Sequence, residues 1–278
     1  MNGIIVVNKP KGITSRDVVN KISRILKIKK VGHNGTLDPL ATGVLIITIG
    51  KYTKLNNMLS SKEKEYIAEV KLGIKTDSLD ISGEILDENN KKLDLSLLKK
   101  TLKKYEKSYM QEVPKYSAVK VNGKKLYEYA RSNIEVKLPK KLVTIKSLQL
   151  LSHTYDKFTF KCKVSKGTYI RSLIRDIMDD MNMYGVMSNL TRVKQGPFDI
   201  SESYTLEDIE KNNYKILKIK DIVDIKTIKV DGEDKKKIKN GCRIKGNYPY
   251  KVLFVDNDNE ELAIYKKDGN IMKVEVML

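Results

Sequence analysis

One short stretch of the sequence combines a single acid with the residues that shape a tight loop. Residues 32–43 read GHNGTLDPLATG and hold one histidine, three glycines, one proline and one acid, Asp38. Glycine allows backbone shapes closed to other residues, and Pro39 biases the aspartate before it away from helix. A lone carboxylate held in such a loop is suited to acid–base or nucleophilic chemistry. The alternative is a turn aspartate that bonds only its own backbone.

The elements around this loop are those of a mixed α/β chain. Residues 44–49 are apolar and β-branched and predict a buried strand directly after the loop, and residues 4–7 predict another strand. Thr14 and Asp17 have the spacing of a capping box, and the apolar residues that follow have helical spacing. The other expected elements are strands over 66–72, 142–151 and 158–164, helices from about 94 and 171, a helix and linker over 206–224, a basic helix over 235–241, and short strands over 251–256, 261–266 and 271–277.

This order of elements predicts the fold class and the division of the chain. We expect a mixed, largely antiparallel α/β (α+β) sheet in a domain of residues 1–225. A small β-rich module, residues 226–278, should follow it. The length of 278 residues fits one large and one small domain.

The charge of the chain favours a polyanionic partner. The formal net charge is +19, from 54 basic and 35 acidic residues, and such an excess is typical of nucleic-acid binding. Lysine used as a general surface residue is the alternative, because only seven of the 54 are arginine. Scarce arginines are expected where planar, two-pronged pairing is needed. We single out Arg171 and Arg192.

Composition excludes several other classes of protein. No run of eighteen apolar residues could cross a membrane, and the first residues resemble a strand rather than a signal peptide. Cys162 and Cys242 form no CxxC pair, and with only two histidines, all far apart, a zinc site is not expected. We expect a cytoplasmic protein without a structural metal.

Tyrosines alternate with cations between residues 111 and 131. Lys120, Lys125, Tyr127 and Arg131 belong to this segment. Cations for phosphate and rings for stacking are what an RNA-contacting surface requires. An ordinary lysine-rich helix and loop is the alternative.

Taken together, these motifs resemble those of the tRNA pseudouridine-55 synthases, the bacterial TruB family. The loop around Asp38 resembles the catalytic motif of that family. Four further segments match in order, namely NKPKGITS at 8–15, KEY at 64–66 with LG at 72–73 and TD at 76–77, YSAVK at 116–120, and SKGTYIRS at 165–172 with LTR at 190–192. Asn34 and Val113 depart from the usual pattern, outside the presumed chemistry. The segment near residues 105–140 resembles the RNA-binding insert of that family, and the last module resembles a reduced PUA-type RNA-binding domain.

The resemblance implies isomerisation of the uridine at position 55 in the T-loop of tRNA. The bond from ribose C1′ to N1 of uracil breaks and C1′ is rejoined to C5, so no cofactor or metal is required. Asp38 would attack the base or the ribose, or abstract a ribose proton, and the sequence does not choose among these. Arg171 would keep the carboxylate ionised in a shielded site.

The substrate-binding residues follow from the same resemblance. The target base must be swung out of the RNA. Tyr66 would stack beneath the uracil, Tyr169 and Leu190 would complete the pocket, and His33 would fill the gap left by the base. A core tyrosine and a loop-bonded histidine are the alternatives for Tyr66 and His33. Residues expected to contact RNA elsewhere are Lys9, Lys64, Lys120, Arg131 and Arg192, with Lys9 also expected to support the catalytic loop.

Three other functions compete with this interpretation. The first is an RNA chaperone that refolds tRNA without chemistry, a role that could coexist with catalysis. The second is a guide-RNA-dependent pseudouridine synthase, which needs protein partners, and the third is a ribosomal-RNA synthase of another family. The long insert and short tail favour a stand-alone monomer that binds the T stem-loop and needs no protein partner.

Overall fold

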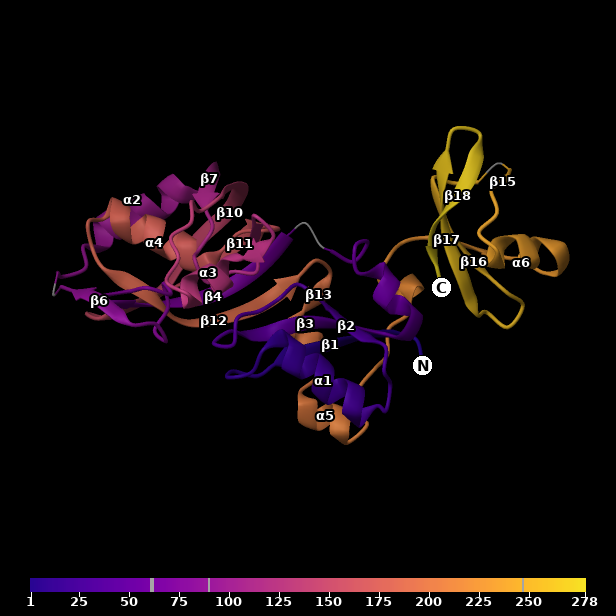
Figure 1. Cartoon of the computed structure of the whole chain (residues 1–278), viewed down its shortest axis with the longest axis horizontal. Helices are drawn as coiled ribbons and strands as arrows, with labels where there is room; N and C mark the ends of the chain where they lie inside the picture. The colour runs from indigo at the N-terminus through magenta and orange to yellow at the C-terminus, as the bar shows by residue number, and fades with distance from the viewer. Residues whose placement is uncertain (61–62, 90, 247) are drawn as a thin grey trace.

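A long mixed sheet runs through the larger part of the molecule (Figure 1). The computed structural model describes residues 1–60, 63–89, 91–246 and 248–278. In this part of the chain the strand order is β1 (Gly3–Lys9), β3 (Thr42–Ile49), β12 (Gly185–Gln195), β4 (Glu63–Leu72), β11 (Lys157–Ser165), β10 (Lys140–His153) and β7 (Ser108–Glu112), with β2 (Val31–Asn34) on β3 and β13 (Phe198–Asp199) on β12. The described pairs are antiparallel except β3 with β12. The expected mixed, largely antiparallel sheet is therefore confirmed.

Helices cover the two ends of this sheet on different faces. The helices α2 (Leu95–Tyr105) and α4 (Ile170–Asp180) pack on β4, β10 and β11, where Leu102, Ile174 and Phe160 share one core. The helices α1 (Ser15–Ile25) and α5 (Leu206–Glu210) lie below β1 and β3 in Figure 1. Alternate residues of β1 and β3 face these two helices, while the others face the C-terminal module. Both faces of these strands are buried, which explains their uninterrupted apolar sequence.

Short elements project from the main sheet. β5 (Ile74–Thr76) and β6 (Ile85–Glu88) form one hairpin, and β8 (Lys120–Val121), β9 (Lys124–Lys125) and α3 (Leu126–Arg131) form the insert. The 3-10 turns are η1 (Gly50–Leu55), η2 (Ile200–Glu202) and η3 (Ile219–Asp221).

A second sheet closes the chain. Its strands are β14 (Lys226–Lys229), β16 (Lys251–Val255), β17 (Glu261–Asp268), β18 (Ile271–Met277) and β15 (Ile244–Lys245), with α6 (Gly232–Lys239) packed on it. This module lies beyond η1 in Figure 1. Leu253, Val255 and Ile264 join the core of β1, β3 and η1, so the junction between module and main sheet is apolar. None of the described helices has the length and apolar character needed to span a bilayer.

Most expected elements are present, but the central strand β12 was not among them. Its pairing with β4 shifts register between Met187 and Asn189 and again between Arg192 and Lys194. Each irregularity breaks the alternation of inward and outward residues. A period-two pattern is therefore absent from residues 185–195, although this strand joins the two halves of the sheet.

Tyr52 links the module to the main sheet and generates a test of the junction. The ring is 1% exposed, and its hydroxyl donates to Glu261 and accepts from the Ile219 backbone N at 3.0 Å. A Tyr52→Phe variant leaves both partners unsatisfied, so the free energy of unfolding should fall by about 1–3 kcal/mol. Thermal and urea denaturation measure the change. Tyr155→Phe is the matched control because Tyr155 is 90% exposed, and an equal effect of both variants would contradict the assignment.

Candidate active site

The loop that carries Asp38 connects β2 to β3 and is held by the start of α1. The Ser15 hydroxyl accepts from the Leu37 backbone N at 2.9 Å and donates to the Leu37 carbonyl at 3.2 Å. Gly12 N donates to the Pro39 carbonyl at 2.8 Å. Thr14 and Asp17 form the expected capping box, which fixes the helix end that carries Ser15. Both sides of Asp38 are therefore anchored.

Two buried cations hold the same loop from inside the protein. Lys9 donates to the carbonyls of Ile13 at 2.7 Å, Pro10 at 2.9 Å and Pro39 at 3.4 Å. Its side chain is 0% exposed, and burial lowers the pKa of Lys9 to about 8. Its ammonium thus supports the loop, as the sequence suggests, but it is not positioned to contact RNA.

Arg192 is the second buried cation and reaches both ends of the loop. Its Nε donates to Val44 O at 2.7 Å, its Nη2 to Gly35 O at 2.8 Å and its Nη1 to Thr36 O at 3.4 Å. The residue is 0% exposed. The expectation that Arg192 contacts RNA does not fit this placement, because a planar guanidinium enclosed by backbone carbonyls cannot reach a phosphate.

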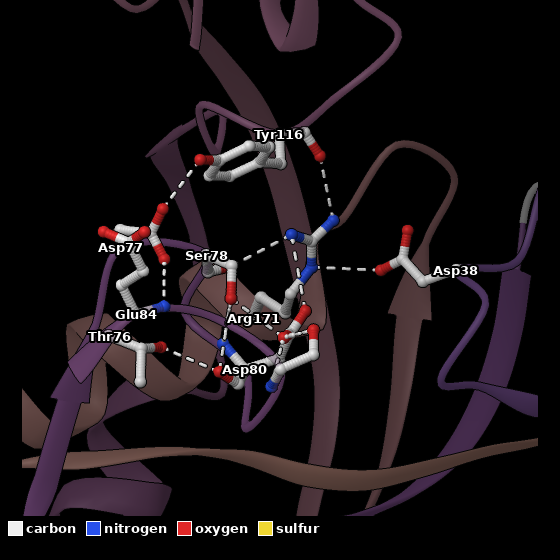
Figure 2. Close-up of polar contacts among 9 residues, drawn as sticks. Asp38, Thr76, Asp77, Ser78, Asp80, Glu84, Tyr116 and Arg171 are labelled. Carbon is white, nitrogen blue, oxygen red and sulfur yellow. Dashed lines mark hydrogen bonds and ion pairs between the residues drawn. The ribbon is translucent and has the colours of Figure 1, made fainter. Parts of the chain in front are cut away.

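Arg171 brings a guanidinium from α4 directly to the acid. Its Nε lies 3.0 Å from Asp38 Oδ2, and its other two nitrogens donate to Ser78 O and Tyr116 O, each at 3.0 Å (Figure 2). The Arg171 side chain is 6% exposed and that of Asp38 is 38% exposed. The cation is therefore fixed by the protein, while the carboxylate still faces the cavity.

Asp80 stands behind Arg171 and is a site residue that the sequence analysis missed. Its Oδ2 lies 3.8 Å from Arg171 Nη1. Its Oδ1 accepts from Ser78 Oγ at 2.8 Å and from Ser82 N at 3.0 Å, and Thr76 Oγ1 donates to its carbonyl at 2.8 Å. Figure 2 shows Arg171 between the two aspartates. The hydroxyl-rich loop over 76–83 can be seen in the sequence, but its pairing with Arg171, 91 positions after Asp80, cannot.

The ion pair lies at one cavity of about 640 Å³ that collects most of the predicted site residues. Its lining includes Asp38, His33, Lys64, Tyr66, Tyr169, Arg171 and Leu190. Lys125 and Tyr127, from the segment predicted to contact RNA, also line it, and so do Arg16 and Met187, which the sequence did not single out. Lys120 and Arg131 do not line the cavity and are exposed on the insert, where Arg131 lies 5.5 Å from the centre of the Tyr127 ring.

The rings and the imidazole of the cavity are uncharged near neutral pH. Burial raises the pKa of Tyr66, with a partial offset from the Arg192 charge, and burial also raises the pKa of Tyr169. Burial and the nearby charges of Arg16 and Arg192 lower the pKa of His33. Its Nδ1 is buried and has no hydrogen-bond partner among the described residues. The loop-bonded alternative for His33 therefore has no support at this atom.

Chemically, the cavity offers an anionic oxygen, a fixed cation and neutral rings. Asp38 Oδ2 is paired, whereas no hydrogen bond joins Oδ1 to any residue that the structure describes. Tyr66, Tyr169 and Leu190 supply flat or apolar surface. No cluster of three or more metal-binding side chains occurs among the described residues. The arrangement suits proton transfer or covalent attack on a flat, neutral substrate.

Comparison with known proteins assigns this combination of fold and site. The family model for the TruB family pseudouridylate synthase N-terminal domain matches residues 23–170. The tRNA pseudouridine synthase B of Lactobacillus johnsonii is 41% identical over 293 residues, covering 100% of this chain and 98% of that protein. The enzyme of the same name from Mesoplasma florum is 39% identical, covering 98% and 96%.

A solved structure shares the fold over almost the whole chain. A chain of the crystal structure of a Cbf5–Nop10–Gar1 complex aligns with a TM-score of 0.71 over 99% of this chain and 84% of that one, at 22% identity. Fold and site thus define a pseudouridylate synthase. The chain belongs to the TruB family, and it is an enzyme that isomerises uridine.

The contacts of Arg192 predict a loss of turnover without a loss of charge. In an Arg192→Lys variant one ammonium replaces a guanidinium that reaches Gly35, Thr36 and Val44. A displacement of the Asp38 loop by about 1 Å should lower the rate at saturating substrate roughly 100-fold. Single-turnover kinetics measure it, with Arg243→Lys, at an exposed position, as control. Wild-type turnover in Arg192→Lys would show that the three contacts are dispensable.

Proposed function

We propose that this tRNA pseudouridine synthase converts uridine 55 in the T-loop of tRNA to pseudouridine, with Asp38 as the catalytic residue. The observation that carries the proposal is the ion pair of Asp38 and Arg171 in a tyrosine-lined cavity. The names of full-length relatives support tRNA as the substrate. The position in the T-loop rests on the sequence motifs.

Asp38 acts as an ionised group. Arg171 places a positive charge 3.0 Å from Asp38 Oδ2, and Arg171 is itself held by two carbonyls and Asp80. Oδ1 is left toward the cavity for the reacting atom. The detached uracil stays between Tyr66 and the apolar wall at Leu190 while C1′ moves from N1 to C5. In this step C5 of the uracil gives up its proton and N1 takes one up, so nothing leaves, and the neutral Tyr66 hydroxyl can relay the proton.

The target base is flipped out of the RNA before it reacts. Unpairing and unstacking a base costs a few kcal/mol, and stacking on a ring returns about 1–3 kcal/mol per base. Tyr66 supplies such a ring inside the cavity, with Tyr169 as the second. His33 lines the same cavity, and its imidazole takes the position that the base vacates in the RNA.

The enzyme works alone, as a cytoplasmic monomer, on the T stem-loop. Relatives named tRNA pseudouridine synthase B match over essentially their whole length. The likeness to the Cbf5 complex is at 22% identity and concerns the fold. Residues 1–225 form the catalytic domain with its RNA-binding insert, and residues 226–278 form a PUA-like module that binds RNA.

A second role as a tRNA-folding chaperone is compatible with the same surface. The exposed cations Lys120 and Arg131 lie on the insert outside the cavity. Such contacts bind RNA without depending on Asp38. An enzyme without its acid should therefore still bind and refold tRNA.

An Asp38→Asn variant tests the catalytic assignment. It keeps the size of the side chain but removes its charge, so pseudouridine formation should fall at least about 10⁴-fold, while the Kd for tRNA changes less than about threefold. The measurement is single-nucleotide mapping of pseudouridine in an unmodified tRNA transcript incubated without cofactor. The matched control is Asp224→Asn, which removes the same charge in the linker. Near wild-type turnover of Asp38→Asn would refute the proposal.

Lys64 predicts how tRNA affinity changes with pH. Burial, with the like charges of Arg192 and Lys166, lowers the pKa of Lys64 to about 8. Above pH 8 the free enzyme loses this cation, so a contact with phosphate weakens and the Kd should rise roughly 3- to 10-fold by pH 9.5. Binding titrations across this range measure it. In Lys64→Arg the charge persists, so the Kd should stay level; a parallel rise in both proteins would exclude Lys64.

A further inference from the structure

The exposed side of α1 carries cations for which the catalytic site has no use. Arg16, Lys21, Arg24 and the following Lys27 are all exposed, and we name these four residues the α1 ridge. The opposite side of α1 buries Val18, Val19 and Ile22. In the part of the chain that the structure describes, no carboxylate forms a direct ion pair with a ridge residue. The acid of α1 itself, Asp17, is hydrogen-bonded to Thr14, and these bonds, with a smaller effect of the Lys21 charge, lower the pKa of Asp17. The charge of the ridge is therefore available to a partner.

The ridge starts at the mouth of the catalytic cavity. Arg16 lines the cavity together with Thr14 and Ser15. Arg24 lies eight residues further along the helix, which is about 12 Å along its axis. A strand of RNA that leaves the cavity on this side meets a line of positive charge with a length of roughly three to four phosphate spacings.

The use of arginine here is notable because arginine is rare in this chain. Arg171, Arg175 and Arg192 are bonded inside the catalytic domain, whereas Arg16 and Arg24 are two of the few exposed ones. Arg16 stands in the first turn of α1, where a cation is unfavourable to the helix dipole. The helix itself therefore gains nothing from this charge. Guanidinium groups are suited to two-pronged contact with phosphate.

Two other groups of lysines are neutralised by the protein. On the sheet face opposite Tyr66, Lys157 pairs with Glu69 at 2.9 Å and Lys161 with Glu65 at 3.2 Å, while Lys163 pairs with both Glu63 and Glu65. In α6, Lys235, Lys236 and Lys237 each have an acidic partner. The helix α5 beside α1 carries Glu207 and Glu210, yet neither pairs with a described ridge residue. The α1 ridge differs from both of these groups.

We propose that the α1 ridge is an additional RNA contact that binds the phosphate backbone of the tRNA as it leaves the catalytic cavity. The proposal rests on the tRNA function proposed above. The helix α1 has no aromatic residue, in contrast to the insert with Tyr127 between Lys125 and Arg131. The ridge therefore positions the RNA without reading or stacking bases.

A charge-removal experiment with a matched control tests the ridge. The test variant is Lys21→Gln with Arg24→Gln and Lys27→Gln; Arg16 is left intact because it lines the cavity. The control variant, Lys157→Gln with Lys161→Gln and Lys163→Gln, loses the same charge from the opposite sheet face. The Kd of an unmodified tRNA transcript is measured between about 50 and 200 mM salt, together with the rate at saturating tRNA.

The expected result is a specific change in the dependence on salt. Each phosphate contact contributes about 0.7–0.9 to the slope of log Kd against log salt, so the ridge variant should lose about 2 from this slope. It should bind tRNA at least 10-fold more weakly at ~0.1 M salt, with an unchanged rate at saturation. The control variant should keep the wild-type slope.

The opposite results overturn the ridge and remain separable from failure of the proposed function. A wild-type slope in the ridge variant would exclude a tRNA contact there and leave an acidic protein or a lipid surface as its partner. Equal losses in both variants would show that only net charge matters. If the wild-type enzyme forms no pseudouridine in tRNA, the proposed function fails instead. Should the triple variant be unstable, Arg24→Gln alone should lower the slope by about 0.7–0.9.

Discussion

The ion pair between Asp38 and Arg171 is the interaction on which the rest of the site depends. An isolated guanidinium is costly to bury, and the Arg171 side chain is only 6% exposed. Asp38 supplies the opposite charge, with its Oδ2 at 3.0 Å from Arg171 Nε. The remaining donors of Arg171 are occupied by two carbonyls, with Asp80 behind them. The cation is therefore already oriented before substrate arrives, and the acid keeps one oxygen for chemistry.

The backbone around the acid is as highly determined as the ion pair. Lys9 and Arg192 bind carbonyl oxygens on the two sides of the loop, and Ser15 holds Leu37 in the middle. No described carboxylate pairs with either buried cation, so their charges also add to the positive potential around Asp38. Structural support and electrostatics come from the same two side chains. This explains why the loop has a fixed shape although it contains Gly35 and is flanked by Gly32 and Gly43.

The sequence predicted the fold well where a single period governs a segment. The helix after Thr14, the alternating strand of Tyr66 and the buried strand after Gly43 all follow from local patterns. The strand β12 did not, because two irregularities of register disturb its alternation. Motif resemblance named Asp38, Tyr66, Arg171 and Leu190, which the structure gathers at one cavity.

Long-range partners could not be inferred in the same way. Asp80 meets Arg171 only through the tertiary fold, and nothing local distinguishes the buried Arg192 from an exposed arginine. The sequence also did not show which lysines form ion pairs in the folded protein. Glutamates on a neighbouring strand neutralise Lys161 and Lys163, whereas Lys21 and Lys27 of the α1 ridge form no ion pair with a described residue. Composition alone gives the total charge but not its location.

The position of β12 has a consequence for how the enzyme folds during its synthesis on the ribosome. This strand, residues 185–195, fills the place between β3 and β4 and brings Arg192 beneath a loop made some 150 residues earlier. Until it emerges, one edge of β4 and the start of β3, at Thr42 and Gly43, are unpaired, and such edges favour association with other chains. Pairing over so long a separation is also slow. The nascent polypeptide therefore stays inactive and vulnerable for most of its synthesis, and catalytic competence arrives in one late step.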